Sequence, residues 1–211
     1  MSTVAGDVSA STAISLALRE GTPISDEAFD GLYPRSQRLR SHVHWTPIEV
    51  ALRVSEMLAP SPGGRILDVG SGAGKMCIVG ALTSGAHWTG VELSGEMVRA
   101  ATTVARYLDA GAQTTFLHTD GLDLDWRPFG GIYLYNPFSE AVFSDGPEDP
   151  VLRQATYVHA VVEVEQKLET LQLGARVVTF HGFGGAMPPG FALTESVPMH
   201  EDSLCLWVRV T

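Results

Sequence analysis

From residue 65 onward, the chain alternates between short apolar runs and longer amphipathic segments. The apolar runs have the length and composition of buried strands, and several of the segments between them have helical spacing. A strand, a helix and another strand in succession require a crossover connection, which makes the strands parallel. We therefore predict an α/β fold. The predicted strands are residues 65–69, 87–92, 114–118, 131–135 and 175–180, and the predicted helices are residues 73–84, 94–109 and 150–172.

Two further apolar runs, residues 191–197 and 203–210, close the chain. Residues 198–202 between them are too few to form a helix, so these two strands should pair antiparallel as a hairpin. The sequence thus predicts a three-layer α/β sandwich, whose seven-stranded and mostly parallel sheet ends in a C-terminal antiparallel hairpin.

The N-terminal part lies outside this alternation. Residues 1–10 are small and polar, and we expect them to form a disordered tail. Residues 11–45 contain two short helical patterns and are predicted to be a small helical cap, in which Ser25 caps the second helix. Residues 46–211 then form the main domain.

The main domain opens on a strong helix signal. Thr46 is a good N-cap residue, Pro47 suits the first helical position, and Glu49 lies where it would complete a capping box with Thr46. Apolar residues at helical spacing follow as far as Pro60. We therefore predict a helix that begins immediately after Thr46.

The composition disfavours several classes of protein. With 14 Lys plus Arg against 24 Asp plus Glu, the net charge of −10 repels phosphate backbones and disfavours nucleic-acid binding through bulk charge. Cys77 and Cys205 lie in apolar surroundings without metal-ligand spacing, so we expect two buried, reduced thiols and no metal site. No stretch has the length of a membrane span and no secretory signal is visible, so we expect a cytoplasmic protein.

A glycine-rich loop, Asp68-Val69-Gly70-Ser71-Gly72-Ala73-Gly74-Lys75, joins the first predicted strand to the next helix. Its glycines let the backbone turn sharply and approach a ligand at the carboxyl ends of the strands. A phosphate-binding loop is disfavoured, because Val69 replaces its first glycine and Met76 replaces its hydroxyl residue. A dinucleotide-binding loop fits better but fails once, because Lys75 stands where its third glycine would pack.

The spacing of Gly70, Gly72 and Gly74, with Asp68 before them, resembles motif I of the class I S-adenosylmethionine-dependent methyltransferases. Further segments agree with that family in order. Glu92 ends the second strand, Asp120-Gly121 follows the third, and Asn136-Pro137-Phe138 follows the fourth. The resemblance spans residue 44 to the C-terminus and implies a Rossmann-like methyltransferase domain with S-adenosylmethionine as its cofactor.

The resemblance also implies roles for single residues. Glu92 would accept hydrogen bonds from both ribose hydroxyls, and Asp120 would lie at the adenine. The lead-in His44-Trp45-Thr46-Pro47 is similar to that of a bacterial group of these enzymes with no assigned substrate. The expected cofactor-binding residues are Asp68, Gly70, Ser71, Gly72, Gly74, Glu92, Leu93, Asp120, Gly121, Asn136, Trp45 and Thr46. The candidate catalytic residues are Asn136, His44 and Glu140, with His181 as a further candidate base.

Structural roles stay open for several of these residues. The loop glycines could serve packing alone, Glu92 could cap the helix that starts near Ser94, and Asp120 could be an ordinary loop acid. Lys75 could be solvated or paired with a carboxylate. The basic residues that could hold an acidic acceptor, or form a solvated face, are Arg35, Arg38 and Arg40.

The methyl acceptor is less defined by the sequence. Asn136-Pro137-Phe138-Ser139 resembles the N-P-P-[FYW] motif of enzymes that methylate planar amino groups, but Phe138 and Ser139 depart from it. We expect a small-molecule acceptor, with a protein acceptor as an alternative and nucleic acid disfavoured by charge. Two other functions stay open. One is a nicotinamide-dependent oxidoreductase, which would share the glycine loop and Glu92, and the other is a non-catalytic module that binds S-adenosylmethionine.

Overall fold

The apolar runs form one seven-stranded sheet, as the sequence predicts. The computed structural model describes residues 4–38, 45–137 and 149–211. The strands lie in the order β3-β2-β1-β4-β5-β7-β6. They are β1 (Arg65–Val69), β2 (His87–Glu92), β3 (Thr114–His118), β4 (Gly131–Tyr135), β5 (Arg176–Phe180), β6 (Phe191–Met199) and β7 (Asp202–Arg209).

Five strands are parallel, and the C-terminal hairpin runs against them. β1 pairs in parallel with β2 on one side and with β4 on the other, so the chain order reverses beside β1. β7 pairs antiparallel with both β5 and β6, which confirms the predicted hairpin. In open α/β sheets, ligands bind at the carboxyl ends of the strands where the order reverses, which is here the end of β1 and β4.

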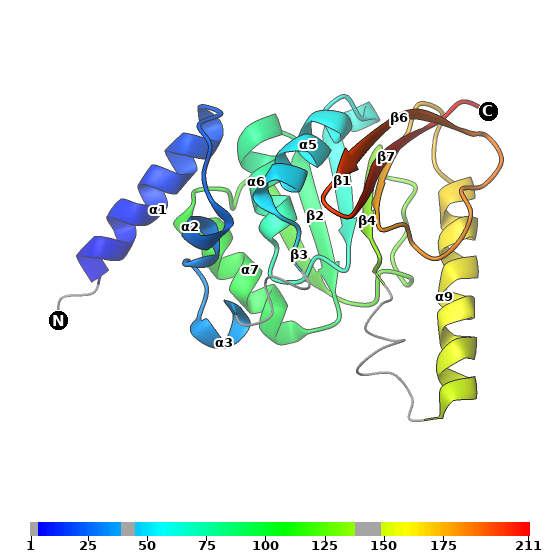
Figure 1. Cartoon of the computed structure of the whole chain (residues 1–211), viewed down its shortest axis with the longest axis horizontal. Coiled ribbons are helices and arrows are strands. Elements are labelled where there is room, and N and C mark those ends of the chain that lie inside the picture. Colours follow the sequence, from blue (N-terminus) through cyan, green and yellow to red (C-terminus); the bar gives the residue numbers. More distant parts are fainter. Residues whose placement is uncertain (1–3, 39–44, 138–148) are drawn as a thin grey trace.

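Helices cover both faces of the sheet. Because neighbouring strand residues point to opposite faces, Ile66 packs into a core with α5 and α6, whereas Leu67 packs into a second core with α9. Figure 1 shows α9 on the opposite side of the molecule from α1, α2 and α3. The helices are α1 (Val4–Arg19), α2 (Asp26–Asp30), α3 (Arg35–Arg38), α5 (Ile48–Leu58), α6 (Lys75–Ser84), α7 (Gly95–Tyr107) and α9 (Pro150–Glu169), with a 3₁₀ turn at Pro62–Gly64.

The helix α1 packs against α6 and α7 and starts earlier than the sequence predicts. It begins at Val4, so residues 4–10, which we expected to be a disordered tail, are helical, and residues 1–3 lie outside the described part. The helix is anchored further along the chain, where Leu18 is buried and Ser15 Oγ donates to the carbonyl of Leu108 at 2.6 Å. Once a helix is anchored, it extends upstream with one hydrogen bond for each residue added.

The caps of α2 and α5 give one confirmed and one wrong prediction. Ser25 caps α2, where its Oγ accepts from the Ala28 N–H at 3.1 Å. The predicted capping box at α5 is absent, because Thr46 Oγ1 instead lies 3.2 Å from the buried Tyr133 hydroxyl. The Ile48 N–H at the start of α5 donates to Asp26 Oδ1 at 2.9 Å, so a carboxylate of α2 replaces the local cap.

Both cysteines are free thiols, as expected, although only Cys77 is fully buried and Cys205 is partly exposed. Cys205 lies on β7 in the outer part of the sheet and is less covered. Cys77 lies on α6, which packs between β2 and α5. Among the helices of the described residues, none combines the length and the apolar character that crossing a membrane requires.

Candidate functional site

The glycine loop turns at the end of β1 through left-handed backbone at Gly70, Gly72 and Gly74. A Cβ added at Gly74 would lie 2.6 Å from both the Ala101 and the Phe116 side chains, so Gly74 lets the loop pack closely. A Cβ at Gly72, by contrast, would meet nothing within 4 Å. The packing role that the sequence left open therefore applies to Gly74, whereas Gly72 presents its backbone to open space.

Glu92 connects the glycine loop to the start of α7. Its Oε2 accepts from the Gly72 N–H at 3.0 Å, and its Oε1 accepts from the Ser94 N–H at 2.8 Å. Ser94 itself caps α7, because its hydroxyl accepts from the Met97 N–H, so Glu92 supports the cap residue and is not the cap. The adjacent Leu93 side chain is exposed. The carboxylate therefore lies beside the glycine backbone at the carboxyl edge of the sheet.

Asp68 is a buried acid at the same edge. The Cys77 thiol donates to its Oδ2 across 3.4 Å. Burial, with a smaller effect of the Glu92 charge, raises the pKa of Asp68 to about 7. Burial and the neighbouring Asp68 also raise the pKa of the Cys77 thiol well above its usual range, so this thiol stays protonated. Asp68 can therefore change charge near neutral pH.

A cavity opens between this loop and β4. Ser71 lines it, and its buried Oγ, which lies over Gly90 of β2, has no hydrogen-bond partner among the described residues. Buried hydroxyls usually have a partner, so a polar ligand group suits this position. The enclosed space is about 40 Å³, so a nucleoside-sized ligand would extend beyond it. The lining residues are Trp45, Thr46, Asp68, Gly70, Ser71, Gly72, Ala73, Lys75, Met76, Tyr133 and Tyr135.

The lining of the cavity includes some of the predicted site residues and does not include others, which are Gly74, Glu92, Leu93, Asp120, Gly121 and Asn136. Asp120 and Gly121 follow β3, where Asp120 Oδ1 accepts from the Leu122 N–H at 2.9 Å. Two lining residues that the sequence analysis did not list as site residues are Tyr133 and Tyr135. They are two positions apart on β4 and therefore face the same side of the sheet. Strand periodicity was the available signal for them, because Tyr135 ends the strand that leads to the predicted Asn136.

The N-terminal cap is fastened directly to the glycine loop. Lys75 is only 4% exposed, and its Nζ pairs with Asp26 Oδ1 at 2.5 Å and with Asp30 Oδ1 at 2.7 Å. The Tyr33 hydroxyl donates to the Ala73 carbonyl at 2.9 Å. The carboxylate-paired alternative for Lys75 is thus confirmed. These contacts join the cap to residues of the proposed ligand loop.

In the cap, the buried rings of Tyr33 and Trp45 pack edge to face with centroids 4.6 Å apart. The basic cluster does not enter the site within the described residues, because Arg35 and Arg38 are exposed. The remaining candidates lie outside the described residues; they are His44, Glu140, Arg40, Phe138 and Ser139.

A backbone hydrogen bond joins the turns that follow β4 and β5. The Asn136 N–H donates to the Gly182 carbonyl at 3.0 Å, which ties the turn after β4 to the turn after β5. The Tyr135 ring stacks on His181 with centroids 5.4 Å apart and an interplanar angle of 25°. His181 therefore lies one ring away from the cavity that Tyr135 lines.

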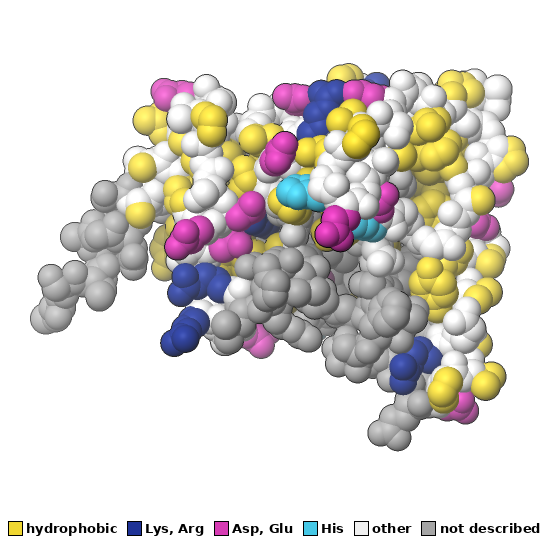
Figure 2. All heavy atoms as spheres, in the orientation of Figure 1, with side chains coloured by type: hydrophobic (Ala, Val, Ile, Leu, Met, Phe, Trp, Pro, Cys, Tyr) yellow, Lys and Arg dark blue, Asp and Glu magenta, His cyan; other side chains and the backbone are white. Residues whose placement is uncertain are grey.

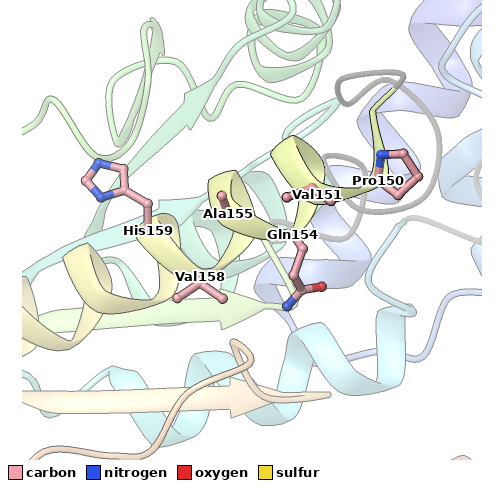
Figure 3. A pocket seen from close by; sticks show the side chains of 6 residues that line it. All are labelled: Pro150, Val151, Gln154, Ala155, Val158 and His159. Atoms are coloured by element: carbon pink, nitrogen blue, oxygen red, sulfur yellow. The ribbon is translucent and has the colours of Figure 1, made fainter.

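A second hollow lies on α9, far from the glycine loop along the sheet. Figure 3 shows its six side chains projecting from one helix, on an almost wholly apolar surface. These residues are Pro150, Val151, Gln154, Ala155, Val158 and His159. Because no convergent polar groups line it, this hollow lacks the features of a catalytic site.

The chain matches no protein-family model and no curated protein. Among solved structures, it is similar to an RNA methyltransferase from Salinibacter ruber in complex with S-adenosyl-L-homocysteine, with 23% identity and a TM-score of 0.56. That match covers 78% of this chain and 93% of the other. The chain has the class I methyltransferase fold.

Two further structures share this fold. TrmN from Thermus thermophilus has 18% identity and a TM-score of 0.60. The match covers 83% of this chain and 53% of TrmN, so this chain spans about half of that protein. A S-adenosylmethionine-dependent O-methyltransferase from Thermotoga maritima has 16% identity and a TM-score of 0.53, with 84% of this chain and 72% of that chain covered. The predicted fold class is thereby confirmed.

Proposed function

We propose that this protein is a S-adenosylmethionine-dependent methyltransferase. The observation that carries the proposal is the pairing of Glu92 with the Gly72 N–H, on a glycine loop at the point where the strand order of a methyltransferase fold reverses. A carboxylate that already accepts two hydrogen bonds at this edge is suited to a ribose diol.

The remaining groups fit the same ligand. Ser71 Oγ offers a buried hydroxyl without a partner, and Gly72 leaves open space at the backbone. Asp120, in the turn after β3, has an oxygen that can accept from an adenine amino group, since the Leu122 N–H bonds only Oδ1. We therefore assign the ligand's amino-acid part to Asp68 and the loop, its sugar to Glu92, and its base to Asp120 and Gly121, with Leu93, Gly74, Trp45 and Thr46 completing the walls.

Catalysis would then depend on orientation. When bound, S-adenosylmethionine supplies an activated methyl group. The chain has to hold the acceptor in line with that group, and orientation of this kind can lower a barrier by roughly 7–11 kcal/mol. Asn136, at the carboxyl end of β4 and tied to Gly182, is the described residue that we place on the acceptor side. His44 and Glu140 remain further candidates.

For the acceptor we propose a small molecule. The net charge of −10 opposes the approach of a polyanion. An RNA acceptor is the second candidate, because two of the similar structures are described as an RNA methyltransferase and as TrmN. A nicotinamide cofactor is less suited to this site. The side chain at the third-glycine position is Lys75, which is buried in ion pairs with α2.

Calorimetry with S-adenosylhomocysteine tests the cofactor assignment. We expect saturable binding by the full chain and about 2.7 kcal/mol of stabilisation at 100 times the dissociation constant. Glu92→Ala should weaken binding about 100-fold, since it removes the two charge-assisted hydrogen bonds that the carboxylate would accept from the ribose hydroxyls. Glu56→Ala, which removes an exposed carboxylate paired with Arg53 on α5, is the matched control. Absence of binding, or preferential stabilisation by NAD, would overturn the proposal.

Labelled methyl transfer tests the acceptor class. Extract is incubated with the enzyme and an isotope-labelled methyl donor, and one half is treated with ribonuclease before the products are separated by size. We expect label in the small-molecule fraction, unchanged by the nuclease. Label that enters nucleotides after digestion would favour the RNA alternative, and label in protein would favour a protein acceptor.

A further inference from the structure

Two adjacent strand ends carry strained backbone. Asn136 follows β4 with φ of 38°, and His181 follows β5 with φ of 56°, in the left-handed region that non-glycine residues rarely adopt. Such a conformation persists only where the surrounding structure holds it. Here the backbone bond between Asn136 and Gly182 holds both turns.

The His181 imidazole faces a carboxylate from another strand. Its Nδ1 lies 2.7 Å from Asp202 Oδ2, an ion pair whenever the imidazole is protonated. The other carboxylate oxygen of Asp202 accepts from the Ser203 N–H at 2.6 Å, which fixes its orientation. The two residues meet because β7 runs antiparallel to β5, so its first residue arrives beside the last residues of β5.

Aromatic rings flank the same imidazole. Phe180 lies with its centroid 4.3 Å away, and Tyr135, which lines the cavity, stacks at 5.4 Å. The His181 side chain is 36% exposed, so it is supported by these rings and still reachable. Figure 2 shows histidine and acidic side chains gathered near the middle of the visible face. The pair is therefore open to a ligand at the carboxyl edge of the sheet.

We propose that His181 is the general base for a phenolic hydroxyl acceptor and that Asp202 is its positioning residue. This inference rests on the proposed methyltransferase function and adds the acceptor class to it. A neutral hydroxyl is a poor nucleophile until its proton leaves, so it needs a base, whereas an ionised acceptor does not. The Tyr135 ring, which lines the cavity beside His181, suits an acceptor that is itself aromatic, whereas Phe180 is buried and supports the imidazole from behind.

The proton and electron balance of the step is simple. The acceptor oxygen forms a bond to the methyl carbon with a lone pair, and the carbon–sulfur bond breaks with its electron pair left on sulfur. The O–H proton passes to Nε2 of His181, because Nδ1 faces Asp202. Asp202 then stabilises the imidazolium until it returns its proton to water. No oxidant or metal is required.

Two acceptors of different acidity test the base. Phenol stays protonated near neutrality, as the tyrosine side chain with its pKa of about 10 does, whereas 4-nitrophenol is largely ionised in mildly alkaline buffer. We expect the full-length enzyme to methylate both. His181→Asn should lower the rate with phenol at least about 100-fold and the rate with 4-nitrophenol less than about threefold. Asn suits the test because it tolerates left-handed backbone.

Two further variants make the result specific. Asp202→Asn should lower the phenol rate by about tenfold and spare 4-nitrophenol, a split that a purely structural role would not produce. His200→Asn is the matched control, since His200 also has a left-handed φ of 53° but lies in the turn between β6 and β7. It should leave both rates unchanged.

Binding of S-adenosylhomocysteine, measured by calorimetry, distinguishes a failure of the base assignment from a failure of the methyltransferase proposal. If the wild type binds it but methylates neither phenol, or if His181→Asn slows both acceptors equally while still binding it, the base assignment is overturned. If the wild type does not bind it, the methyltransferase proposal itself fails.

Discussion

The two halves of the sheet's carboxyl edge are built in different ways. Around β1 and β2, one continuous loop from Gly70 to Gly74 bonds to the end of β2, where the Gly72 N–H donates to Glu92 and the Gly70 N–H donates to the Val91 carbonyl. Around β4, β5 and β7, single side chains of Tyr135, His181 and Asp202 meet from distant parts of the sequence. The first half is one local segment whose packing helps to stabilise the fold. The second half consists of side chains that come from separate strands and contribute less to the packing of the core. Changes in the first half should therefore destabilise the protein, and changes in the second should spare it.

The largest effect on stability is expected at the glycine loop. Gly74→Ala places a methyl group 2.6 Å from Ala101 and Phe116 in left-handed backbone, so we expect a loss of about 4 kcal/mol, the sum of strain and overpacking. Gly72→Ala has the same backbone sign but open space, and should lose only about 1–2 kcal/mol. Urea denaturation measures both. Equal losses would show that packing does not distinguish the two glycines.

The buried acid gives a pH-dependent effect of similar size. Asp68 has an ordinary pKa of 3.8 in the unfolded chain and one of about 7 when folded, so the native state holds the extra proton between these values. The free energy of unfolding should therefore fall as pH rises through that window, by up to about 4 kcal/mol. Asp68→Asn should remove this fall.

Urea titrations at about pH 5 and about pH 8 measure the difference between wild type and Asp68→Asn. The exposed Asp123→Asn is the matched control and should keep the wild-type profile. An Asp68→Asn variant that loses stability with rising pH as steeply as the wild type would contradict the effect of burial.

The next largest loss of stability is expected from breaking the ion pairs of Lys75 that hold the N-terminal cap. Lys75→Met leaves Asp30 without its buried cation and should lower the free energy of unfolding by about 3 kcal/mol, near the low end for a broken buried pair because Asp26 is half exposed. Arg127→Met breaks the exposed pair with Asp125 and should change stability little. Thermal unfolding compares the two. A Lys75→Met variant as stable as Arg127→Met would show that the cap is held by its apolar contacts alone.

The smallest change in stability is expected in the half of the edge around β4, β5 and β7. Asn136→Gly relieves left-handed strain while adding freedom to the unfolded chain, so the two effects should cancel to within about 1 kcal/mol. Methyl transfer should nevertheless fall, if the Asn136 side chain contacts the acceptor. Asp109→Gly makes the same change at φ of 55° after α7 and should leave transfer intact. Loss of transfer in both variants would remove the distinction between the halves.

The difference between the halves also explains what could be predicted. The alternation of apolar runs predicted all seven strands to within a few residues, and the glycine spacing predicted the sharp turn after β1, because both signals are local. The predicted capping box at Thr46 was wrong because the buried Tyr133 hydroxyl takes that side chain, a tertiary demand with no trace in the neighbouring sequence. The helical start of α1 likewise depends on its contacts with α6 and α7.

The pairing of His181 with Asp202 could not be predicted for a related reason. His181 was visible as a candidate base, but its partner depends on the register between β5 and β7. That register sets which residue of the hairpin lies beside the end of β5, and residue spacing alone does not reveal it.

The antiparallel course of β7 has a consequence for how such a site could diversify. Because β7 enters the sheet from the turn after Met199, the length of that turn determines which side chain is delivered opposite His181. Adding or deleting a residue there would exchange the partner of the imidazole without altering the loop between Gly70 and Gly74. Selection acting on this terminal hairpin can thus change the surroundings of His181 while the glycine loop stays constant.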